Sequence, residues 1–255
     1  MPHVEGAGVA LHYRSQGDGP VVLLVHGMAS DALVWEPLAE QLAAGGLRAV
    51  ALDRRGYGAS GAPEPYAATT VQEQSEDVAA LLDAVCPDGR PVLLAGDGFG
   101  ALVVLELLVR RPDLARAAVL AEPPLYAFVP AATPALADER TLLEQGLRDG
   151  GPAAAIRAWL AQEAPGADES RIERAVAAAR GFFADYAGRA SWSPSRRELR
   201  AIGVPVAVVT GAASPGHVVA AADAVAALVP DARRVRDGDV GAAVLALEAR
   251  GPASS

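Results

Sequence analysis

The sequence predicts an α/β protein built on a mostly parallel, doubly wound sheet. Short apolar runs recur along the chain, and segments with helical spacing of apolar residues lie between them. Strands that alternate with helices imply right-handed crossovers and helices on both faces of one sheet. A length of 255 residues with 51% hydrophobic content suffices for one large core with an insertion.

The first half of the chain supplies most of the expected strands and helices. The apolar runs predict an entry strand at 9–14 and buried strands at 21–25, 47–52, 92–95 and 117–121. The helical patterns predict helices at 31–44, 70–85 and 101–110. Each helix follows a strand, as a parallel sheet with crossover connections requires.

The second half interrupts this alternation with helices alone. From Glu122-Pro123-Pro124 to about residue 194 we expect helices at 138–148, 152–162 and 168–186 and no strands. Strands at 204–210 and 233–236 and helices at 218–228 and 241–250 then complete the fold, with a frayed end at 251–255. The predicted organisation is therefore a core from 1–122 and 196–255, interrupted by a helical segment at 123–195.

Composition excludes several classes of function. A net charge of −9 without blocks of like charge argues against nucleic acid or an anionic membrane as partner. No Cys/His cluster has metal-ligand spacing, and no glycine-rich phosphate motif follows a strand, so we expect neither metal nor cofactor. The single Cys86 and the absence of a secretory signal pattern favour a cytoplasmic location. The sequence leaves the oligomeric state open.

The stretch PVLLAGDGFG at 91–100 has the pattern of a strand, a sharp turn and a helix. A G-x-S-x-G turn needs small residues two places before and two places after the reactive residue. Gly96 and Gly100 meet that need around position 98, which is Gly98. The alternative register puts Asp97 at the turn, where Phe99 would crowd the second small position. We therefore expect Gly98 at the turn.

Two further motifs accompany this turn in order along the chain. They are His26-Gly27 after one strand, and Asp53-x-Arg55-Gly56-x-Gly58-x-Ser60 after the next. Together with the turn they resemble the α/β-hydrolase superfamily over residues 9–122 and, more loosely, 196–250. The resemblance implies an α/β-hydrolase fold and makes the helical segment at 123–195 a lid over the pocket.

The same resemblance indicates that the Ser-His-Asp triad is missing. Gly98 stands where the family carries its nucleophile, and Ser214 where it usually carries its acid. The loop 237–240, where the family carries its histidine, holds none. Loss of triad members costs a serine hydrolase several powers of ten in rate. We therefore expect a mode of action without a serine nucleophile.

Some of the family's machinery does not depend on the lost side chains. The backbone amides of Met28 and Phe99 are expected to form an oxyanion hole. Asp97 and His217 are the candidate catalytic residues, since His217 is the only histidine that family geometry places on the rim. The alternative for His217 is a solvated residue that begins a helix. His12, in the entry strand, is expected at the far end of the sheet from the site.

The candidate ligand-binding residues come from the turns and from the lid. Of the 12 aromatic residues, seven lie between 126 and 192, which indicates a hydrophobic or aromatic ligand. The alternatives are that these rings pack the lid on the core and that Ser30 helps cap a helix. The expected ligand-binding set is His26, Gly27, Ser30, Gly98, Tyr126, Phe128, Trp159, Phe183 and Ser214.

Three functional hypotheses follow. The first is a non-hydrolytic enzyme that performs a cyclisation, isomerisation or C–C rearrangement on a hydrophobic, polyketide- or aromatic-type small molecule. The second is a non-catalytic protein that binds a ligand or partner. The third is an ester or epoxide hydrolase in which Asp97 or His217 activates water. In all three, serine-directed fluorophosphonates should not label the pocket.

Overall fold

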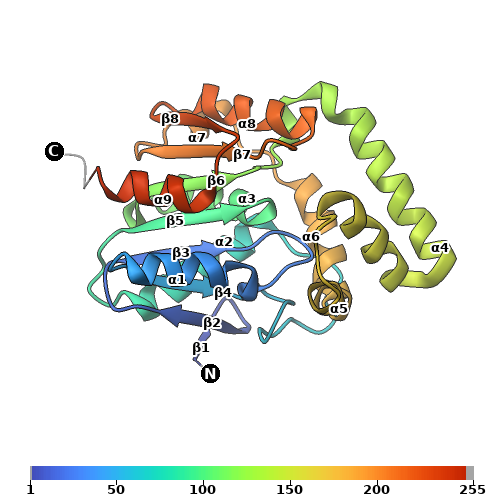
Figure 1. Cartoon of the computed structure of the whole chain (residues 1–255), viewed down its shortest axis with the longest axis horizontal. Coiled ribbons are helices and arrows are strands. Elements are labelled where there is room, and N and C mark those ends of the chain that lie inside the picture. The colour runs from blue at the N-terminus through green and yellow to red at the C-terminus, as the bar shows by residue number, and fades with distance from the viewer. Residues whose placement is uncertain (1, 251–255) are drawn as a thin grey trace.

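A computed structural model describes residues 2–250 and contains one eight-stranded sheet, as Figure 1 shows. The strand order is β1-β2-β4-β3-β5-β6-β7-β8. β2 is antiparallel to both of its neighbours, and β3 to β8 are mutually parallel. The strands are β1 His3–Glu5, β2 Ala10–Gln16, β3 Val21–Val25, β4 Arg48–Leu52, β5 Val92–Asp97, β6 Ala115–Ala121, β7 Val206–Thr210 and β8 Ala232–Arg236. The predicted α/β class with a mostly parallel, doubly wound sheet is confirmed.

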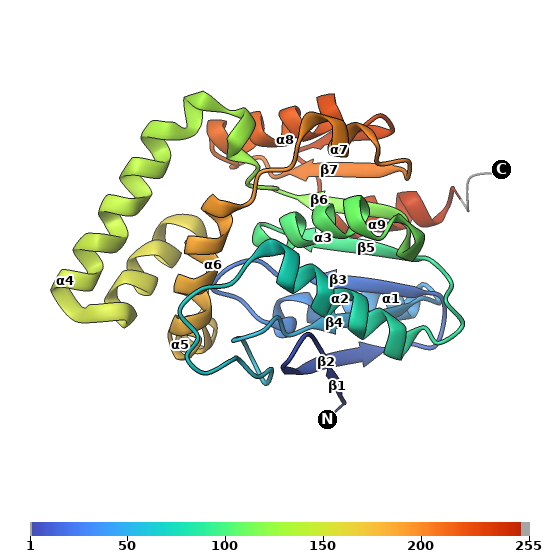
Figure 2. The same ribbon diagram turned by 180° about the vertical axis from the view of Figure 1, so that it is seen from behind.

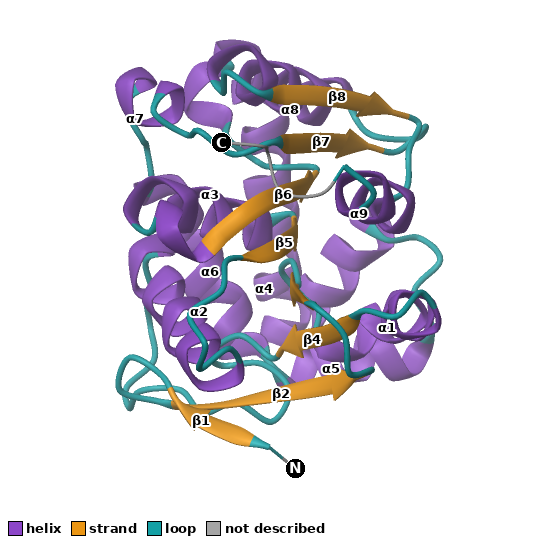
Figure 3. Ribbon diagram, turned by 90° about the vertical axis from the view of Figure 1, so that its left-hand side faces the viewer, coloured by secondary structure: helices purple, strands orange, loops and turns teal. Residues whose placement is uncertain are grey.

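Helices cover both faces of the sheet. Figure 3 shows α1 and α9 on one side and α2 and α3 on the other. Successive strand residues point to opposite faces, so Leu23 belongs to the same core cluster as Leu81 of α2, and Leu24 belongs to the cluster on the other face with Leu42 of α1. These helices, with α8, are α1 Glu36–Ala44, α2 Val71–Val85, α3 Phe99–Arg110, α8 Gly216–Leu228 and α9 Val240–Glu248.

A helical insertion between β6 and β7 lies beyond the carboxyl ends of the parallel strands, as Figures 1 and 2 show. We call residues 123–195 the lid. Its main helices are α4 Thr133–Glu163, α5 Glu169–Ala177 and α6 Ala179–Ser191, and α7 Arg196–Arg200 leads back to β7. α4 bends at Gly150 and Gly151, where the sequence predicts a break.

The prediction of a single helix at 168–186 is wrong, because the structure divides this segment into α5 and α6 at Ala178. Ala178 has φ −89° and ψ 24°, and its N–H still bonds to the Arg174 carbonyl. No glycine or proline marks this position. The bend comes from packing, since Phe182 of α6 is fully buried in the main core cluster.

Two features at the amino-terminal edge differ from the prediction. β1 was not predicted, because three half-exposed residues become a strand only by pairing with β2. His12 does not lie at the far end of the sheet: β2 runs antiparallel, so Tyr13 pairs with Leu52 and the His12 carbonyl accepts from the Asp53 amide at 3.0 Å. His12 therefore lies where the parallel strands end.

The expected frayed end at 251–255 lies outside the described residues. Among residues 2–250, no helix combines the length and the apolar character that a bilayer crossing requires.

Candidate functional site

The turn between β5 and α3 has Gly98 at its sharpest point. Gly98 has φ 50° and ψ −118°, a conformation that side-chain-bearing residues rarely adopt. A Cβ on Gly96 would lie 2.5 Å from the Gly100 carbonyl oxygen, and a Cβ on Gly100 would overlap the Val25 carbonyl oxygen. The two flanking glycines are therefore required by close backbone approach, and Asp97 ends β5 just before the turn.

The turn forms the floor of a cavity of about 130 Å³. Gly27 and Met28 come from the turn after β3, and Asp97, Gly98 and Phe99 come from the turn after β5. A Cβ on Gly27 would lie 3.1 Å from Asp97 Oδ2, so the two turns are in contact. Lid residues complete the walls: Tyr126, Trp159, Glu163, Ala164, Arg171 and Arg189.

The Asp97 carboxyl group is the titratable centre of this cavity. Burial and the nearby charge of Glu122 raise the pKa of Asp97 to about 6, against the opposing effects of Arg171, Arg54 and the Gly98 amide. A carboxyl group with such a pKa can both accept and donate a proton near neutral pH.

Glu122 is a cavity residue that the sequence analysis did not select. It follows β6 directly, and its φ of 46° lies in the left-handed region that favours glycine. Its Oε1 accepts hydrogen bonds from the Ser214 hydroxyl and, at 3.4 Å, from the Gly211 amide. β6 lies beside β5 in the sheet, and this strand order is the signal that would have placed Glu122 next to Asp97.

The His26 ring is fixed in the core beneath the cavity. The Arg54 amide donates to His26 Nε2 at 3.0 Å, so Nδ1 carries the proton and donates to the Gly27 carbonyl at 2.8 Å. Burial and the charge of Arg54 hold the pKa of His26 well below its usual value. His26 is therefore a neutral structural side chain that does not line the cavity.

Several other predicted residues lie outside the cavity. The His217 ring packs on Tyr126 with ring centroids 5.5 Å apart, and Phe183 packs on Phe182 at 5.1 Å. The Arg196 guanidinium lies 5.1 Å from the Phe128 ring centroid. These contacts match the packing alternative for the lid rings, and a catalytic role for His217 stays a prediction.

The two predicted serines also lie outside the cavity lining. Ser214 bonds to Glu122, and Ser30 is buried beside Asp31. Asp31 rather than Ser30 caps the following 3₁₀ turn, accepting from the Leu33 amide at 3.1 Å. Ser214 thus acts on the cavity only through the Glu122 carboxylate.

The lid contributes charged residues that the sequence analysis missed. Arg189 pairs with Glu139 at 2.5 Å, whereas Arg171 Nε is buried without a hydrogen-bond partner in residues 2–250. Burial, together with the charge of Glu139, raises the pKa of Glu163. Arg171 thus lines the cavity, while its Nε is buried away from the open space.

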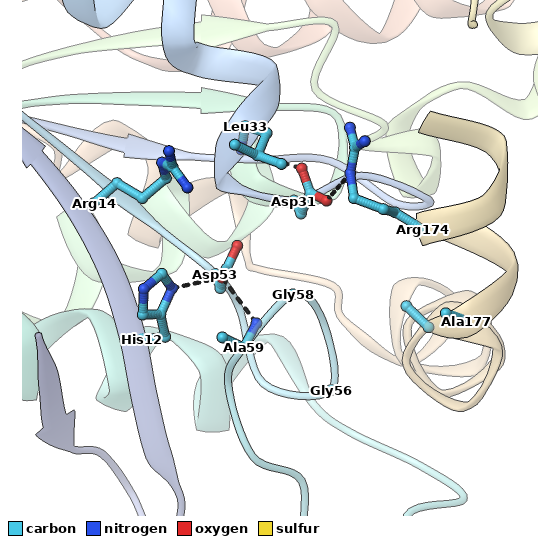
Figure 4. A pocket seen from close by; sticks show the side chains of 11 residues that line it. His12, Arg14, Asp31, Leu33, Asp53, Gly56, Gly58, Ala59, Arg174 and Ala177 are labelled. Carbon is cyan, nitrogen blue, oxygen red and sulfur yellow. Dashed lines mark hydrogen bonds and ion pairs between the residues drawn. The ribbon is translucent and has the colours of Figure 1, made fainter. Parts of the chain in front are cut away.

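A second hollow, of about 350 Å³, lies between the β4 loop and α5 (Figure 4). His12 Nδ1 is 2.7 Å from Asp53 Oδ2, and Asp53 also accepts from the Ala32 and Ala59 amides at 2.7 and 3.0 Å. Across the hollow, Arg174 pairs with Asp31 at 2.6 Å. These groups are paired with one another, which indicates that Asp53 stabilises the loop. In the described part of the chain, no group of three His, Cys, Asp or Glu residues could hold a metal ion.

A family model and several curated relatives match parts of the chain. The family model described as "Serine aminopeptidase, S33" matches residues 18–164. An epoxide hydrolase of Caballeronia sordidicola is 36% identical over 106 residues, which are 42% of this chain and 32% of that protein. The "probable oxidoreductase EphD" of Mycobacterium tuberculosis is 34% identical over 108 residues, 42% of this chain and 18% of that protein. The chain thus spans about a third or less of the curated relatives it matches.

Solved structures match over nearly the whole chain. An α/β hydrolase from Sphaerobacter thermophilus has a TM-score of 0.76 at 26% identity, covering 97% of this chain and 99% of that one. A hydrolase from Pseudomonas aeruginosa has a TM-score of 0.77 at 22% identity and covers 96% of both chains. An enol-lactonase from Burkholderia xenovorans has a TM-score of 0.72 at 21% identity, covering 98% and 96%. The predicted α/β-hydrolase fold is confirmed.

Proposed function

Because the chain belongs to the serine aminopeptidase S33 family of α/β-hydrolase-fold proteins, we propose that it is a small-molecule hydrolase that works without an enzyme nucleophile. One observation carries the proposal: Gly98, which has no reactive atom, occupies the sharp turn, while the Asp97 carboxyl group lines the adjoining cavity.

The positions that would complete a triad support this reading. Ser214, after β7, donates its hydroxyl to Glu122, and the loop 237–240 after β8 contains no histidine. Neither an acyl-serine intermediate nor a histidine base is available at these positions. The proposed reaction therefore uses water as the nucleophile.

Asp97 and two backbone amides supply the chemistry. The N–H groups of Met28 and Phe99 bind the substrate carbonyl oxygen, and the Asp97 carboxylate takes a proton from a water molecule as its oxygen bonds to the carbonyl carbon. The tetrahedral oxyanion then collapses, the C–O bond to the leaving group breaks, and Asp97 returns the proton to the departing alkoxide. Each oxyanion donor contributes roughly 3–4 kcal/mol in enzymes of known mechanism.

The cavity favours a small, uncharged substrate. Its volume of about 130 Å³ is below the range of roughly 300 Å³ and more that is typical of ligand pockets. The carboxyl groups of Glu122 and Glu163 on its wall disfavour an anion. A neutral ester or lactone fits these limits. A polyketide-sized ligand would require the lid helices to move.

Non-hydrolytic proton transfer is the second candidate. One carboxyl group beside two oxyanion donors is also what enolisation requires, because a base and a stabilised oxygen suffice. An isomerisation, cyclisation or C–C rearrangement could therefore use Asp97 in the same place. The two candidates differ in whether an oxygen atom from water enters the product.

The test is to incubate the protein with small esters, lactones and epoxides in ¹⁸O-labelled water and to measure the masses of the products by mass spectrometry. We expect hydrolysis with one ¹⁸O atom incorporated, strong loss of turnover in Asp97→Asn, and no change in the matched exposed variant Asp18→Asn. Product without ¹⁸O would favour the second candidate. Labelling of the pocket by a fluorophosphonate, or full activity in Asp97→Asn, would contradict both. Thermal stabilisation by ligands with no product at all would indicate a binding protein.

A further inference from the structure

A fully buried arginine contacts the backbone of the turn that presents the Met28 amide. Arg54, in the loop after β4, is 1% exposed. Its Nε donates to the His26 carbonyl at 2.8 Å, and its Nη2 donates to the Gly27 carbonyl, also at 2.8 Å. One guanidinium group therefore holds two consecutive peptide groups immediately before Met28.

The geometry of the peptide bond makes this contact significant. The Gly27 carbonyl and the Met28 N–H belong to one peptide unit, and in a trans unit they point in opposite directions. A carbonyl directed at Arg54 therefore turns the Met28 N–H away from Arg54. Within residues 2–250 that N–H donates to no protein acceptor, and Met28 lines the cavity.

The charge that keeps Arg54 in place comes from the lid. Asp185 of α6 is fully buried, and its Oδ2 lies 2.7 Å from Arg54 Nη2. Tyr57 OH donates to the same oxygen at 2.7 Å, and Gln74 Nε2 donates to Oδ1 at 2.7 Å. Gln74 Oε1 in turn accepts from Arg54 Nη1 at 2.7 Å. The carboxylate that pairs with Arg54 therefore lies on a lid helix.

We propose that Asp185 is a positioning residue that acts through Arg54 to fix the Gly27 peptide, so that the Met28 N–H faces the cavity. The lid and the oxyanion turn are then one mechanical unit. The inference rests on the proposed function only in treating the Met28 amide as a substrate contact. Arg54 is the variable position of the Asp53-x-Arg55-Gly56 motif, so the motif alone does not select it.

The neighbouring ion pair supplies a matched control. Arg55 Nε lies 2.6 Å from Asp77 Oδ2; Arg55 lies in the loop after β4, Asp77 lies on α2, and both side chains are buried. Arg55 also donates to the Ala7 carbonyl, and it makes no contact with the turn after β3. Asp77→Asn therefore disturbs a comparable buried pair but leaves the contacts between Asp185, Arg54 and the Gly27 peptide in place.

The test compares Asp185→Asn, Asp77→Asn and the double variant Arg54→Met/Asp185→Leu. Breaking one half of a buried pair is strongly destabilising, whereas replacing both halves by apolar residues is often tolerated. We expect the double variant to keep the fold while it removes both Arg54 contacts with the carbonyls, which leaves His26 Nδ1 as the remaining donor to the Gly27 carbonyl. Arg54→Lys is a further variant, which keeps the charge but lacks the forked donor.

Two measurements are made on each folded variant: the ¹H–¹⁵N resonance of the Met28 amide, and kcat and KM with an ester or lactone that the wild type hydrolyses. We expect the double variant to shift the Met28 resonance and lower kcat about 10²-fold, the scale of one oxyanion donor, with KM changed less than about threefold. Asp77→Asn should leave the Met28 resonance and kcat unchanged.

An unshifted Met28 resonance in a folded double variant or in Arg54→Lys would overturn the inference, whatever the activity. A shifted resonance with unchanged kcat would overturn the catalytic part of it. If the wild type hydrolyses none of the substrates, the proposed function fails. The Met28 resonance would still show whether Asp185 and Arg54 fix the orientation of the Gly27 peptide.

Discussion

The Asp97 carboxylate is less stable in its cavity than in water, because burial and Glu122 raise its pKa to about 6. A carboxyl group with a raised pKa binds its proton more tightly in the folded than in the unfolded chain. The resulting cost is absent below the ordinary pKa of about 4, grows between about pH 4 and 6, and is fully present above pH 6.

Replacing Asp97 by asparagine should therefore stabilise the protein at high pH. With partial exposure allowed for, we expect Asp97→Asn to raise the free energy of unfolding at pH 8 by on the order of 2 kcal/mol. The gain should shrink as pH falls through 6 towards 4, where the wild-type carboxyl group is also neutral. Urea denaturation of both proteins at the two pH values checks this, and an equal gain at both would contradict the pKa. A stabilised variant that has lost turnover would mark Asp97 as a functional residue.

Glu122 should tune the pH at which Asp97 becomes active. The base form of Asp97 is needed, so kcat/KM should fall about tenfold per pH unit below about 6. Glu122→Gln removes the charge that raises the pKa, and this acidic limb should move to lower pH while burial keeps it above the value for free aspartate. Glu163→Gln is the control, because Glu163 is not among the groups that shift the pKa of Asp97. A profile that moves equally in both variants would refute the pairing of Asp97 with Glu122.

At the scale of elements, the strand–turn–helix unit contains two glycines, Gly98 and Gly100, that are required for different physical reasons. Gly100 is needed because its Cα faces the Val25 carbonyl, whereas a Cβ on Gly98 would meet only Gly27 Cα, at 3.7 Å. We expect Gly98→Ala to cost about 1–2 kcal/mol of stability, from its positive φ alone. Gly100→Ala should cost roughly 3 kcal/mol or prevent folding, since backbone must move. Thermal unfolding of the two variants checks this order, and equal losses would show that the turn packs differently.

This unit could be read from the sequence because its constraints are local. Strand, glycine spacing and helix lie within twenty residues, and the steric demand on Gly96 and Gly100 follows from the turn itself. The buried strands could be predicted for the same reason, because each strand is marked by a short apolar run in the local sequence. The position of His12 was misjudged because an antiparallel partner reverses which end of a strand meets the site, and apolar spacing does not encode direction.

The cavity could be predicted only in part, because its walls join elements far apart in the chain. Its floor, with Met28, Asp97 and Phe99, follows from the motifs. Glu122 follows β6 and Arg171 lies on α5, and neither stands in a motif; the order of the strands brings Glu122 to Asp97, and the packing of the lid brings Arg171. Of the predicted lid aromatics, Tyr126 and Trp159 line the cavity, whereas Phe128 and Phe183 contact other protein side chains, and their role in ligand binding stays a prediction.

On the scale of the whole molecule, the lid is attached to the core unevenly. Asp185 of α6 is buried in the Arg54 network, and Trp192, just after α6, donates to Glu106 of α3 at 2.9 Å. α5 is held more weakly, since Arg174 reaches Asp31 at 2.6 Å from a partly exposed position. When the lid opens, α5 and the bend of α4 should therefore separate from the core first, while α6 stays packed on the sheet.

Hydrogen exchange followed by mass spectrometry can test this order of release. Arg174→Gln removes the α5 contact and leaves Asp31, which is buried, without its counter-charge. We expect faster exchange in α5 and in the bend of α4, and unchanged protection in α6, because the Asp185 network is untouched. Arg157→Gln is the control: its pair with Glu169 joins α5 to α4 and not to the core, both side chains are exposed, and exposed pairs contribute little. If α6 lost protection together with α5, the lid would open as a single body, and the Asp185 contact would not anchor the oxyanion turn independently of the rest of the lid.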